Sequence, residues 1–593
     1  MIALLSWLRS ILASVLNGIA KFVALLVMVA AVLVVIGLAR GDGLPANSVL
    51  TLDLRQTIAD SASRPPFPLA VRPVTMMGLI FALDDAGRDK RIKGMIMRLG
   101  AGMPLAQAEE LTQALARFKQ HGKFVIAQTT GFQGPGLGDY VAASAANEIW
   151  VQPRSDFAVS GAGVGELFLR GLIDKVHAVP QMVKRAEFKS AADMFMEKDM
   201  TAPDREQLGQ VVRSWYDAAL DESARARHLT REQVQAAFEA SPQFGEDARA
   251  KGLVDRIGYD DDAFGAALGR AGAGAKPLKM SDYIKSREGA SGMTAANVAV
   301  IEAAGEIADG TAGTSLIGSS AGIASDDLSA AIRQATRDSD IKVILLRVDS
   351  PGGSVTASDQ ILDAVKKAQA KGKPVVVSMA GLAASGGYYI SASADRIVAE
   401  PGTLTGSIGV LTGKVTFAGT ADMIGAKLSE VSIGKNTLMD SPVAPYTQDQ
   451  LAAVNREADV IYNDFLNKVA SGRHLPLSQV QDVARGRVWT GADAATHGLV
   501  NGLGGFWTAA GLAASLGKLA PDQLVFRVYP KPRGFWDEAV RFFGGAGDSV
   551  KTLENIQTVM DLPAVHTVTE AIHDAPRHRV ELRAPNVARF LGN

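Results

Sequence analysis

The sequence predicts an α/β protein built from two copies of one unit, with a single apolar segment ahead of them. Short apolar runs alternate with helical stretches of about 10–15 residues along most of the chain, which is the pattern of parallel strands joined by helices. Matching motifs recur in the same order roughly 250 residues apart. The chain has 593 residues, more than one hydrophobic core normally organises, so we expect two to four domains.

The composition excludes several classes of function. Apolar residues make up 47% and charged residues 21%, as in ordinary folded proteins. A formal net charge of −1 gives no electrostatic reason to expect a nucleic-acid partner. The absence of cysteine excludes disulfides, thiolate metal sites and a cysteine nucleophile. The eight histidines are scattered without HExxH-type spacing, and there is no P-loop, so we expect no metal and no cofactor.

The apolar segment, residues 22–39, has the properties of a membrane anchor. Its eighteen residues carry no charge, which is near the lower limit for a transmembrane helix. A cleaved signal peptide is the alternative, but the apolar core of such a peptide usually has about 7–15 residues, and no clear cleavage site follows Ala39. Arg9 and Lys21 precede the segment and favour a cytoplasmic N-terminus. We therefore expect residues 1–45 to form a short cytoplasmic end and a signal-anchor in the lipid bilayer.

The two copies are expected at residues 46–270 and 297–525, joined by a linker at 271–296 that is rich in Gly, Ala, Ser and Lys. Six motif pairs match in order at offsets of 246 to 250 residues, which is hard to obtain by chance. After residue 525 the pattern fades, and residues 526–593 are expected to be an extension of unknown role. The main counterparts are residues 91–99 and 340–348, 124–127 and 374–378, 140–145 and 389–394, 159–164 and 405–410, and 252–255 and 498–501.

These counterparts give the elements of each copy in order. The apolar runs at 91–99 and 340–348 predict a buried strand, and a helix follows each of them. A second strand comes next, then a short segment of small residues, then a glycine-containing turn. Each copy ends in polar helices, expected at 204–240 and 448–484. In the first of these, apolar residues recur at the spacing of one buried helical face, at Leu208, Val211, Val212 and Trp215.

A serine followed by two glycines is the candidate nucleophile. Ser385 lies in the sequence Ala-Ser-Gly-Gly, about thirty residues after the glycine-rich turn at 349–354. A hydroxyl nucleophile must be accessible, and its oxyanion needs backbone N–H donors that glycine allows to come close. Tight helix packing is the alternative explanation of the same residues. The first copy has Gly136 at the matching position and lacks the glycine pair, so only the second copy keeps a candidate nucleophile.

The candidate base comes from the other copy. A serine nucleophile needs a base, and His474 and His497 of the second copy have no obvious acidic partner. Lys189 of the first copy follows an apolar strand-like run, and Thr437 replaces it in the second copy. We therefore predict a composite Ser–Lys site between the halves, with an exposed surface lysine as the alternative. The prediction requires burial to lower the lysine pKa by several units from about 10.4.

Together these motifs resemble the long, tandem-repeat signal peptide peptidases of the S49 serine peptidase family. The resemblance extends from the apolar segment to about residue 525. Each motif alone is a weak signal, but the combination is specific. The motifs are Asp-Ser-Pro-Gly-Gly at 349–353, Ala-Ser-Gly-Gly-Tyr at 384–388, Leu-Thr-Gly-Ser-Ile-Gly at 404–409 and Phe-Lys-Ser-Ala at 188–191.

The resemblance implies a role for each matching residue. Ser385 matches the family's nucleophile and Lys189 its general base. Ser407 matches a serine that orients the lysine. The backbone amides of Gly353 and Gly386 fall where the family places its oxyanion hole. The sequence departs from the family's motif at Glu187-Phe188, directly before Lys189. In a strand, Glu187 would share a face with Lys189 and oppose the lowering of its pKa.

The resemblance also implies a fold, a location and a substrate. The fold would be a tandem duplication of a ClpP/crotonase-like α/β unit behind one N-terminal transmembrane helix. The protein would be a homotetramer anchored in the bacterial inner membrane, with its catalytic part on the periplasmic side. Its substrates would be signal peptides left in the membrane after preprotein processing. A crotonase-like acyl-transfer enzyme and a non-catalytic membrane scaffold are the two alternatives.

Overall fold

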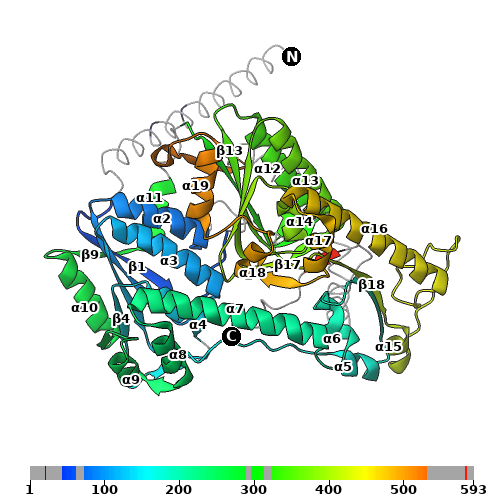
Figure 1. Ribbon diagram of the computed structural model, residues 1–593, viewed down its shortest axis with the longest axis horizontal. Coiled ribbons are helices and arrows are strands. Elements are labelled where there is room, and N and C mark those ends of the chain that lie inside the picture. Colours follow the sequence, from blue (N-terminus) through cyan, green and yellow to red (C-terminus); the bar gives the residue numbers. More distant parts are fainter. Residues whose placement is uncertain are drawn as a thin grey trace, which may run out of the picture.

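The computed structural model describes residues 43–61, 73–134, 136–288, 295–312 and 322–530, together with Lys21, Met28 and the backbone of 581–583. Within these residues the chain forms two α/β units that share a mixed sheet (Figure 1). The predicted anchor at residues 22–39 lies outside the described residues except for Met28. In the ranges just given, no helix is both long enough and apolar enough to cross a membrane.

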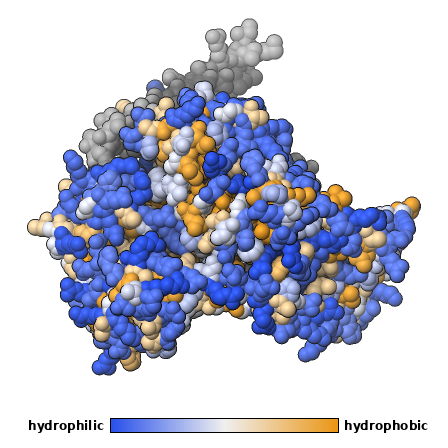
Figure 2. All heavy atoms as spheres, in the orientation of Figure 1, coloured by the Kyte–Doolittle hydropathy of each residue, from blue (hydrophilic) through white to orange (hydrophobic). Residues whose placement is uncertain are grey.

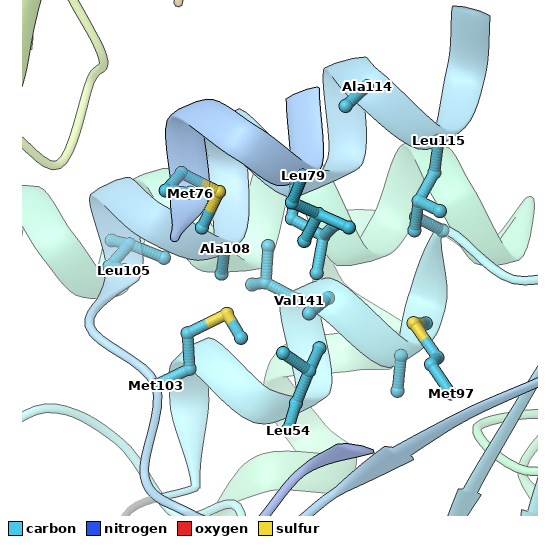
Figure 3. Close-up of a cluster of buried hydrophobic side chains, with 14 of the residues drawn as sticks. Leu54, Met76, Leu79, Met97, Met103, Leu105, Ala108, Ala114, Leu115 and Val141 are labelled. Atoms are coloured by element: carbon cyan, nitrogen blue, oxygen red, sulfur yellow. The ribbon is translucent and has the colours of Figure 1, made fainter. Parts of the chain in front are cut away.

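The first unit has a parallel six-stranded sheet in the order β8-β4-β3-β2-β1-β9. Its strands are almost continuously apolar because helices cover both faces. Figure 3 shows one face, where Leu79 and Leu115 of the covering helices lie above Leu54 and Met97 of the strands. The strands are β1 (Ser48–Leu54), β2 (Ile92–Leu99), β3 (Phe124–Thr129), β4 (Glu148–Val151), β8 (Arg256–Ile257) and β9 (Lys276–Lys279). The helices are α2 (Met76–Arg88), α3 (Leu105–Gln120), α4 (Leu137–Ser144), α10 (Asp260–Ala271) and α11 (Met280–Glu288).

The second unit repeats this plan around an eight-stranded sheet. Its order is β19-β17-β15-β13-β10-β21, with β16 paired to β15 and β20 paired to β16. All pairs are parallel except β17 with β19. The strands are β10 (Val298–Ala304), β13 (Val343–Ser350), β15 (Val375–Ala384), β16 (Arg396–Ala399), β17 (Leu404–Gly406), β19 (Val488–Thr490), β20 (Gly502–Leu503) and β21 (Phe526–Tyr529). The helices are α12 (Ser325–Arg337), α13 (Val355–Ala370), α14 (Gly386–Ser391), α18 (Gly491–Thr496) and α19 (Phe506–Leu516).

Apolar and polar contacts join the two units. Helix α19 packs between the second sheet and the first unit, where its Phe506 ring lies 5.1 Å from the ring of Phe81 in α2. A mixed sheet in the order β12-β11-β14-β22-β18-β6 then crosses from one unit to the other. Its strands are β6 (Val179–Arg185), β11 (Glu306–Ala308), β12 (Gly322–Ala324), β14 (Gly352–Ser354), β18 (Val410–Thr416) and β22 (Glu581–Arg583). Because β6 pairs with β18, the residues that follow β6 lie next to the second unit.

Two long helices, one in each unit, begin and end in the same way, as the duplication predicts. Helices α7 (Ala202–Arg227) and α16 (Gln448–Arg473) each have 26 residues and begin after a threonine N-cap. Each ends at a histidine in the left-handed conformation, His228 and His474. The smaller elements are α5 (Arg170–Lys175), η1 (Ser190–Ala192), α6 (Asp193–Met196), α8 (Arg231–Glu239), α9 (Gly245–Ala250), α15 (Ala418–Met423), α17 (Leu477–Val483), η2 (Pro521–Gln523), and the antiparallel pair β5 (Asp156–Phe157) and β7 (Gln243–Phe244).

Two segments differ from the sequence prediction. The predicted linker at 271–296 contains β9, which extends the first sheet, and α11, whose Tyr283 is fully buried. The predicted extension at 526–593 begins with β21, which pairs in parallel with β10. Both strands are edge strands of four residues. An edge strand buries few side chains, so it leaves little of the alternating apolar pattern by which a strand is recognised in a sequence.

Candidate active site

Ser385 occupies the sharp turn between β15 and α14. Its φ of +56° and ψ of −115° are unfavourable for a residue with a side chain. The backbone holds this turn from both sides: Ser385 N–H donates to Gly406 O at 2.9 Å, and Tyr389 N–H donates to Ser385 O at 2.8 Å. Gly136, at the same place before α4, has φ +52°. The two positions share a positive φ but differ in ψ, which is +12° at Gly136 and −115° at Ser385, and only the second copy has a hydroxyl there.

Gly353, which the sequence predicts in a turn, lies in strand β14 and packs against the turn at Ser385. A Cβ on Gly386 would come within 3.1 Å of Gly353 N and 3.0 Å of Gly352 Cα. A Cβ on Gly353, which has φ +149°, would lie 2.1 Å from Ile307 O. Both positions therefore require glycine. Their close approach brings two backbone amides next to the candidate nucleophile, which is the arrangement that stabilises an oxyanion.

Lys189 reaches Ser385 from the other half of the chain. Its Nζ lies 2.8 Å from Ser385 Oγ and 2.9 Å from both the Oγ and the carbonyl O of Ser407. The lysine side chain is fully buried, and this burial holds its pKa well below the usual range. A neutral amine donates two hydrogen bonds and accepts one. Donation to the two Ser407 oxygens leaves its lone pair facing the Ser385 hydroxyl.

A turn and a buried glutamine position the lysine. Residues 186–189 form a turn after β6, and a Cβ on Gly486 would lie 2.6 Å from Lys189 Cβ. Gln207 of α7 is fully buried and donates from Nε2 to Phe188 O at 3.0 Å. Neither Gly486 nor Gln207 is among the site residues predicted from the sequence. The sequence does contain a signal for Gln207. It precedes Val211 and Trp215 by four and eight residues, which places it on the buried face of that helix.

Glu187 does not lie on the same face as Lys189, which corrects the expectation based on a strand at these residues. Because residues 186–189 form a turn and not a strand, side chains two positions apart do not share a face. Glu187 pairs instead with Arg485, and both side chains are partly exposed. Its charge is directed away from Lys189 and does not appear among the causes of the low lysine pKa.

The two histidines named above, and one further lysine of the second copy, Lys435, lie elsewhere. Lys435 is exposed and pairs with Asp449 at 2.6 Å. His474 ends α16, and the ring of His497 lies 4.3 Å from the ring of Trp489. Across the described ranges, no group of three or more histidine, aspartate or glutamate residues is placed to hold a metal ion. A hydroxyl, a neutral amine and two close amides can together carry out acyl transfer through a serine ester.

Family models identify the class of protein. The model described as Peptidase family S49 matches residues 117–272 and 367–520, one match in each copy. The model described as Clp protease matches residues 320–402 in the second copy. The chain therefore belongs to peptidase family S49, as a tandem form with two ClpP-like α/β units.

Curated relatives narrow the class to a serine endopeptidase. The chain is 31% identical over 546 residues to Protease 4 of Salmonella typhi, covering 85% of each chain. It is 30% identical over 472 residues to Protease 4 of Haemophilus influenzae, covering 77% of this chain and 75% of that one. It is 32% identical over 479 residues to the chloroplastic serine protease SPPA of Arabidopsis thaliana, covering 79% and 69%. The protein is a serine endopeptidase that acts on peptides.

Proposed function

We propose that this endopeptidase uses Ser385 and Lys189 as a dyad to degrade signal peptides left in the membrane after preprotein processing. The contact of 2.8 Å between Lys189 Nζ and Ser385 Oγ carries the proposal. It joins the one copy's nucleophile to the other copy's base, and both groups are fully buried. Among the described residues, Lys189 Nζ contacts only Ser385 and Ser407 and no carboxylate. Burial of a lysine without an acidic partner is costly, which favours a catalytic role over a structural one.

The proposed reaction follows from this geometry. Neutral Lys189 takes the Ser385 proton while Oγ attacks the peptide carbonyl carbon. The amides of Gly353 and Gly386 hold the oxyanion, each contributing roughly 3–4 kcal/mol to transition-state stabilisation. The lysine ammonium protonates the leaving amine as the peptide bond breaks. Water then attacks the serine ester with Lys189 again as base, and Ser407 keeps the amine in place throughout.

The location and assembly belong to the same proposal. Residues 22–39 anchor the protein in the bacterial inner membrane as a single-pass span, with the catalytic part on the periplasmic side. An anchored enzyme suits substrates that are apolar and held in the membrane. Two repeats, with predicted bounds of 46–270 and 297–525 and with β9 and β21 added to their sheets, share one site. It assembles as a homotetramer, as the family resemblance implies.

A strand beside Gly353 of β14 supports binding of an extended peptide. β22 lies between β14 and β18, antiparallel to β14, with Leu582 opposite Gly353. A peptide added to a sheet edge gains main-chain hydrogen bonds along its length. Because Gly353 supplies one of the proposed oxyanion amides, a substrate strand at the position of β22 presents its carbonyl groups next to the nucleophile.

Removing β22 is expected to improve substrate binding. If the chain's own strand competes with the peptide, deletion of residues 581–593 should lower KM several-fold and leave kcat within about twofold. Deletion of residues 584–593 keeps β22 and serves as the control. Steady-state kinetics with an apolar peptide of about twenty residues measures both constants. An unchanged or higher KM in the longer deletion would show that β22 does not occupy the substrate's place.

Covalent labelling tests the proposed dyad. The detergent-solubilised wild-type protein should react with a fluorophosphonate, and Ser385→Ala should lose all labelling. Lys189→Met should lose most of it, whereas Ser393→Ala, at a partly buried position on the turn after α14, should label normally. Labelling lost only in Ser385→Ala would keep the nucleophile and reject the lysine base. A wild-type protein that does not label would favour a crotonase-like enzyme or a scaffold.

A further inference from the structure

We propose that Gln207 is a positioning residue of the Ser–Lys site, and that a carboxyl pair, Glu166 and Asp204, holds its amide in place while the two carboxyl groups share one proton. This role rests on the dyad of the proposed function, and it names the residues that set the geometry of that dyad. Labelling of variants of the dyad and of the amide distinguishes a failure of one from a failure of the other.

Gln207 lies on the inner face of α7, the long helix that spans both units (Figure 1). The outer face of this helix is polar, and Figure 2 shows a mostly hydrophilic surface along it. Asp204 precedes Gln207 by one turn on the same face, and both side chains are fully buried. A buried amide needs a partner for its donor and its acceptor atoms. The partners of Gln207 show which parts of the chain it joins.

The Gln207 amide joins the lysine turn to the second unit. Its Nε2 donates to Phe188 O, directly before Lys189, at 3.0 Å. Its Oε1 accepts from Val488 N–H of β19 at 3.2 Å. A carbonyl oxygen can only accept and a backbone N–H can only donate, so the two ends of the amide cannot be exchanged. One side chain therefore fixes the position of the lysine turn relative to β19.

The strand next to β19 holds Ser385 and Ser407. β19 pairs antiparallel with β17, where Val488 lies opposite Gly406. Gly406 O accepts from Ser385 N–H at 2.9 Å. The next residue, Ser407, accepts from Lys189 Nζ. A change at the amide bridge therefore alters the distance between the amine and the hydroxyl, and a misplacement of about 1 Å can cost about 10²-fold in rate.

The duplicated sequence supports this role. α7 and α16 have the same length and begin 246 residues apart, and the same offset relates α9 to α18. At this offset Ala453 takes the place of Gln207, and Pro242 of the first copy takes the place of Val488. Alanine has no side-chain amide, and proline has no N–H to donate. The copy that has Thr437 in place of the lysine therefore also lacks the side chain that positions the lysine.

A carboxyl pair holds the amide from its other side. Asp204 Oδ1 accepts from Gln207 Nε2 at 2.8 Å. No backbone N–H, side-chain N–H or hydroxyl among the described residues donates to Asp204 Oδ2, which is buried. The carboxyl group of Glu166 forms a hydrogen bond with Asp204. A hydrogen bond between two carboxyl groups requires a proton on one of them, so protonated Glu166 is the donor that Asp204 otherwise lacks.

The charges around the pair keep this proton bound at neutral pH. Burial, the hydrogen bond to Asp204 and the nearby charges of Asp204 and Asp193 raise the pKa of Glu166 to about 8. Lys184 of β6 pairs with Asp193 of α6 at 2.6 Å, and Glu197 follows that helix. These are the charged groups that face the pair among the described residues. Above about pH 8 Glu166 ionises and repels Asp204, which should displace the amide that Asp204 holds.

Two substitutions test the positioning role. Gln207→Met keeps the length of the side chain and removes its hydrogen bonds, whereas Gln207→Glu keeps the shape and puts an oxygen against Phe188 O. Each should lower kcat by about 10²-fold and leave KM within about twofold. Gln448→Glu, at the exposed first position of α16, is the matched control and should keep the wild-type kcat. A wild-type kcat in Gln207→Met overturns the proposal.

A pH profile tests the shared proton without removing a fully buried group. Glu166→Gln replaces the proton with a permanent N–H donor to Asp204. The wild-type kcat should fall by about fivefold or more between pH 8 and pH 10, whereas that of Glu166→Gln should change less than about twofold. At pH 7.5 the variant should keep about a third or more of the wild-type kcat, because its amide makes the same contact. An equal alkaline fall in both proteins overturns the role of the pair.

The rate of fluorophosphonate labelling at pH 7.5 separates this role from the dyad. We expect Gln207→Met to label at least about tenfold more slowly than the wild type, because its lysine is misplaced. Wild-type labelling of Gln207→Met beside lost labelling of Lys189→Met would keep the dyad and overturn the positioning role. Wild-type labelling of Lys189→Met would overturn the dyad and, with it, the role of Gln207.

Discussion

Replacing Lys189 with methionine is expected to abolish peptidase activity and, at the same time, to raise the melting temperature. Without the proposed base, Ser385 should keep its proton, and kcat/KM should fall by about 10³-fold or more. Methionine fills nearly the same volume with an apolar side chain that needs no hydrogen-bond partner. Folding then no longer has to strip a charged amine of water. Activity with a peptide substrate and thermal melting at pH 7 measure the two effects.

The sign of the stability change follows from the lysine's two environments. In the folded protein burial lowers the Lys189 pKa well below its usual range, whereas in the unfolded chain it stays near 10.4. The unfolded state therefore binds more protons between these two pKa values, and stability rises with pH over that window. At pH 7 the lysine costs stability that methionine does not. Each kcal/mol regained should raise the melting temperature by about 2–4 °C.

The titration of Lys189 should also appear in the pH dependence of the peptidase rate. Peptidase activity should rise with pH through the lowered lysine pKa, because only the neutral amine accepts the serine proton. Lys435→Met is the control: this lysine is exposed, so neither activity nor melting temperature should change. A Lys189→Met variant that melts below the wild type would mean that the contacts with Ser407 outweigh the cost of burial. A rate that falls as pH rises from 6 to 8 would contradict the lysine base.

Much of this arrangement could be predicted because a duplicated sequence contains its own comparison. Apolar runs at matching places predict the buried strands β2 and β13, and the opposite losses at Gly136 and Thr437 predict that the two halves share one site. The structure places the Lys189 and Ser385 side chains in hydrogen-bonding contact. Their catalytic roles, and the domain boundaries, stay predictions.

The other features of the site and of the contact between the halves could not be predicted from the sequence. They depend on which parts of the chain pack against each other in the fold. In the sequence, Gln207 looks like any other polar residue of a polar helix. Its role depends on its hydrogen bond to Phe188, in a turn that is distant from the helix in the sequence. The ion pairs between the halves are hidden for the same reason. Arg347 lies in the middle of an apolar strand, and nothing local in the sequence indicates that its partners come from residues 60 and 110.

Replacing Arg347 with methionine is expected to destabilise the protein more than any surface substitution. The guanidinium is 2% exposed and pairs with Asp60 at 2.7 Å and Glu110 at 2.8 Å, both from the first half. Removing one member of a buried ion pair leaves uncompensated charge and costs about 3–5 kcal/mol. Carboxylates surround this site: burial raises the pKa of Glu109 to about 8 and that of Glu302 to about 7. Urea unfolding at pH 5 and pH 8 measures the loss.

The free energy of unfolding that Arg347→Met removes should be larger at pH 8 than at pH 5. Carboxylates with raised folded-state pKa values contribute stability that is complete below about pH 4 and is lost as the pH passes 7 to 8. At pH 8 these groups ionise beside Asp60 and Glu110, which then have no cation, whereas protonation at pH 5 relieves part of the repulsion. Arg98→Met is the matched control, because Arg98 holds the same place in the first copy. Its side chain is 34% exposed and its partner Asp260 is 38% exposed, so the loss should stay below about 1 kcal/mol. Equal losses in the two variants, or a greater loss at pH 5, would mean that Arg347 does not balance the buried carboxylates that lie where the halves meet.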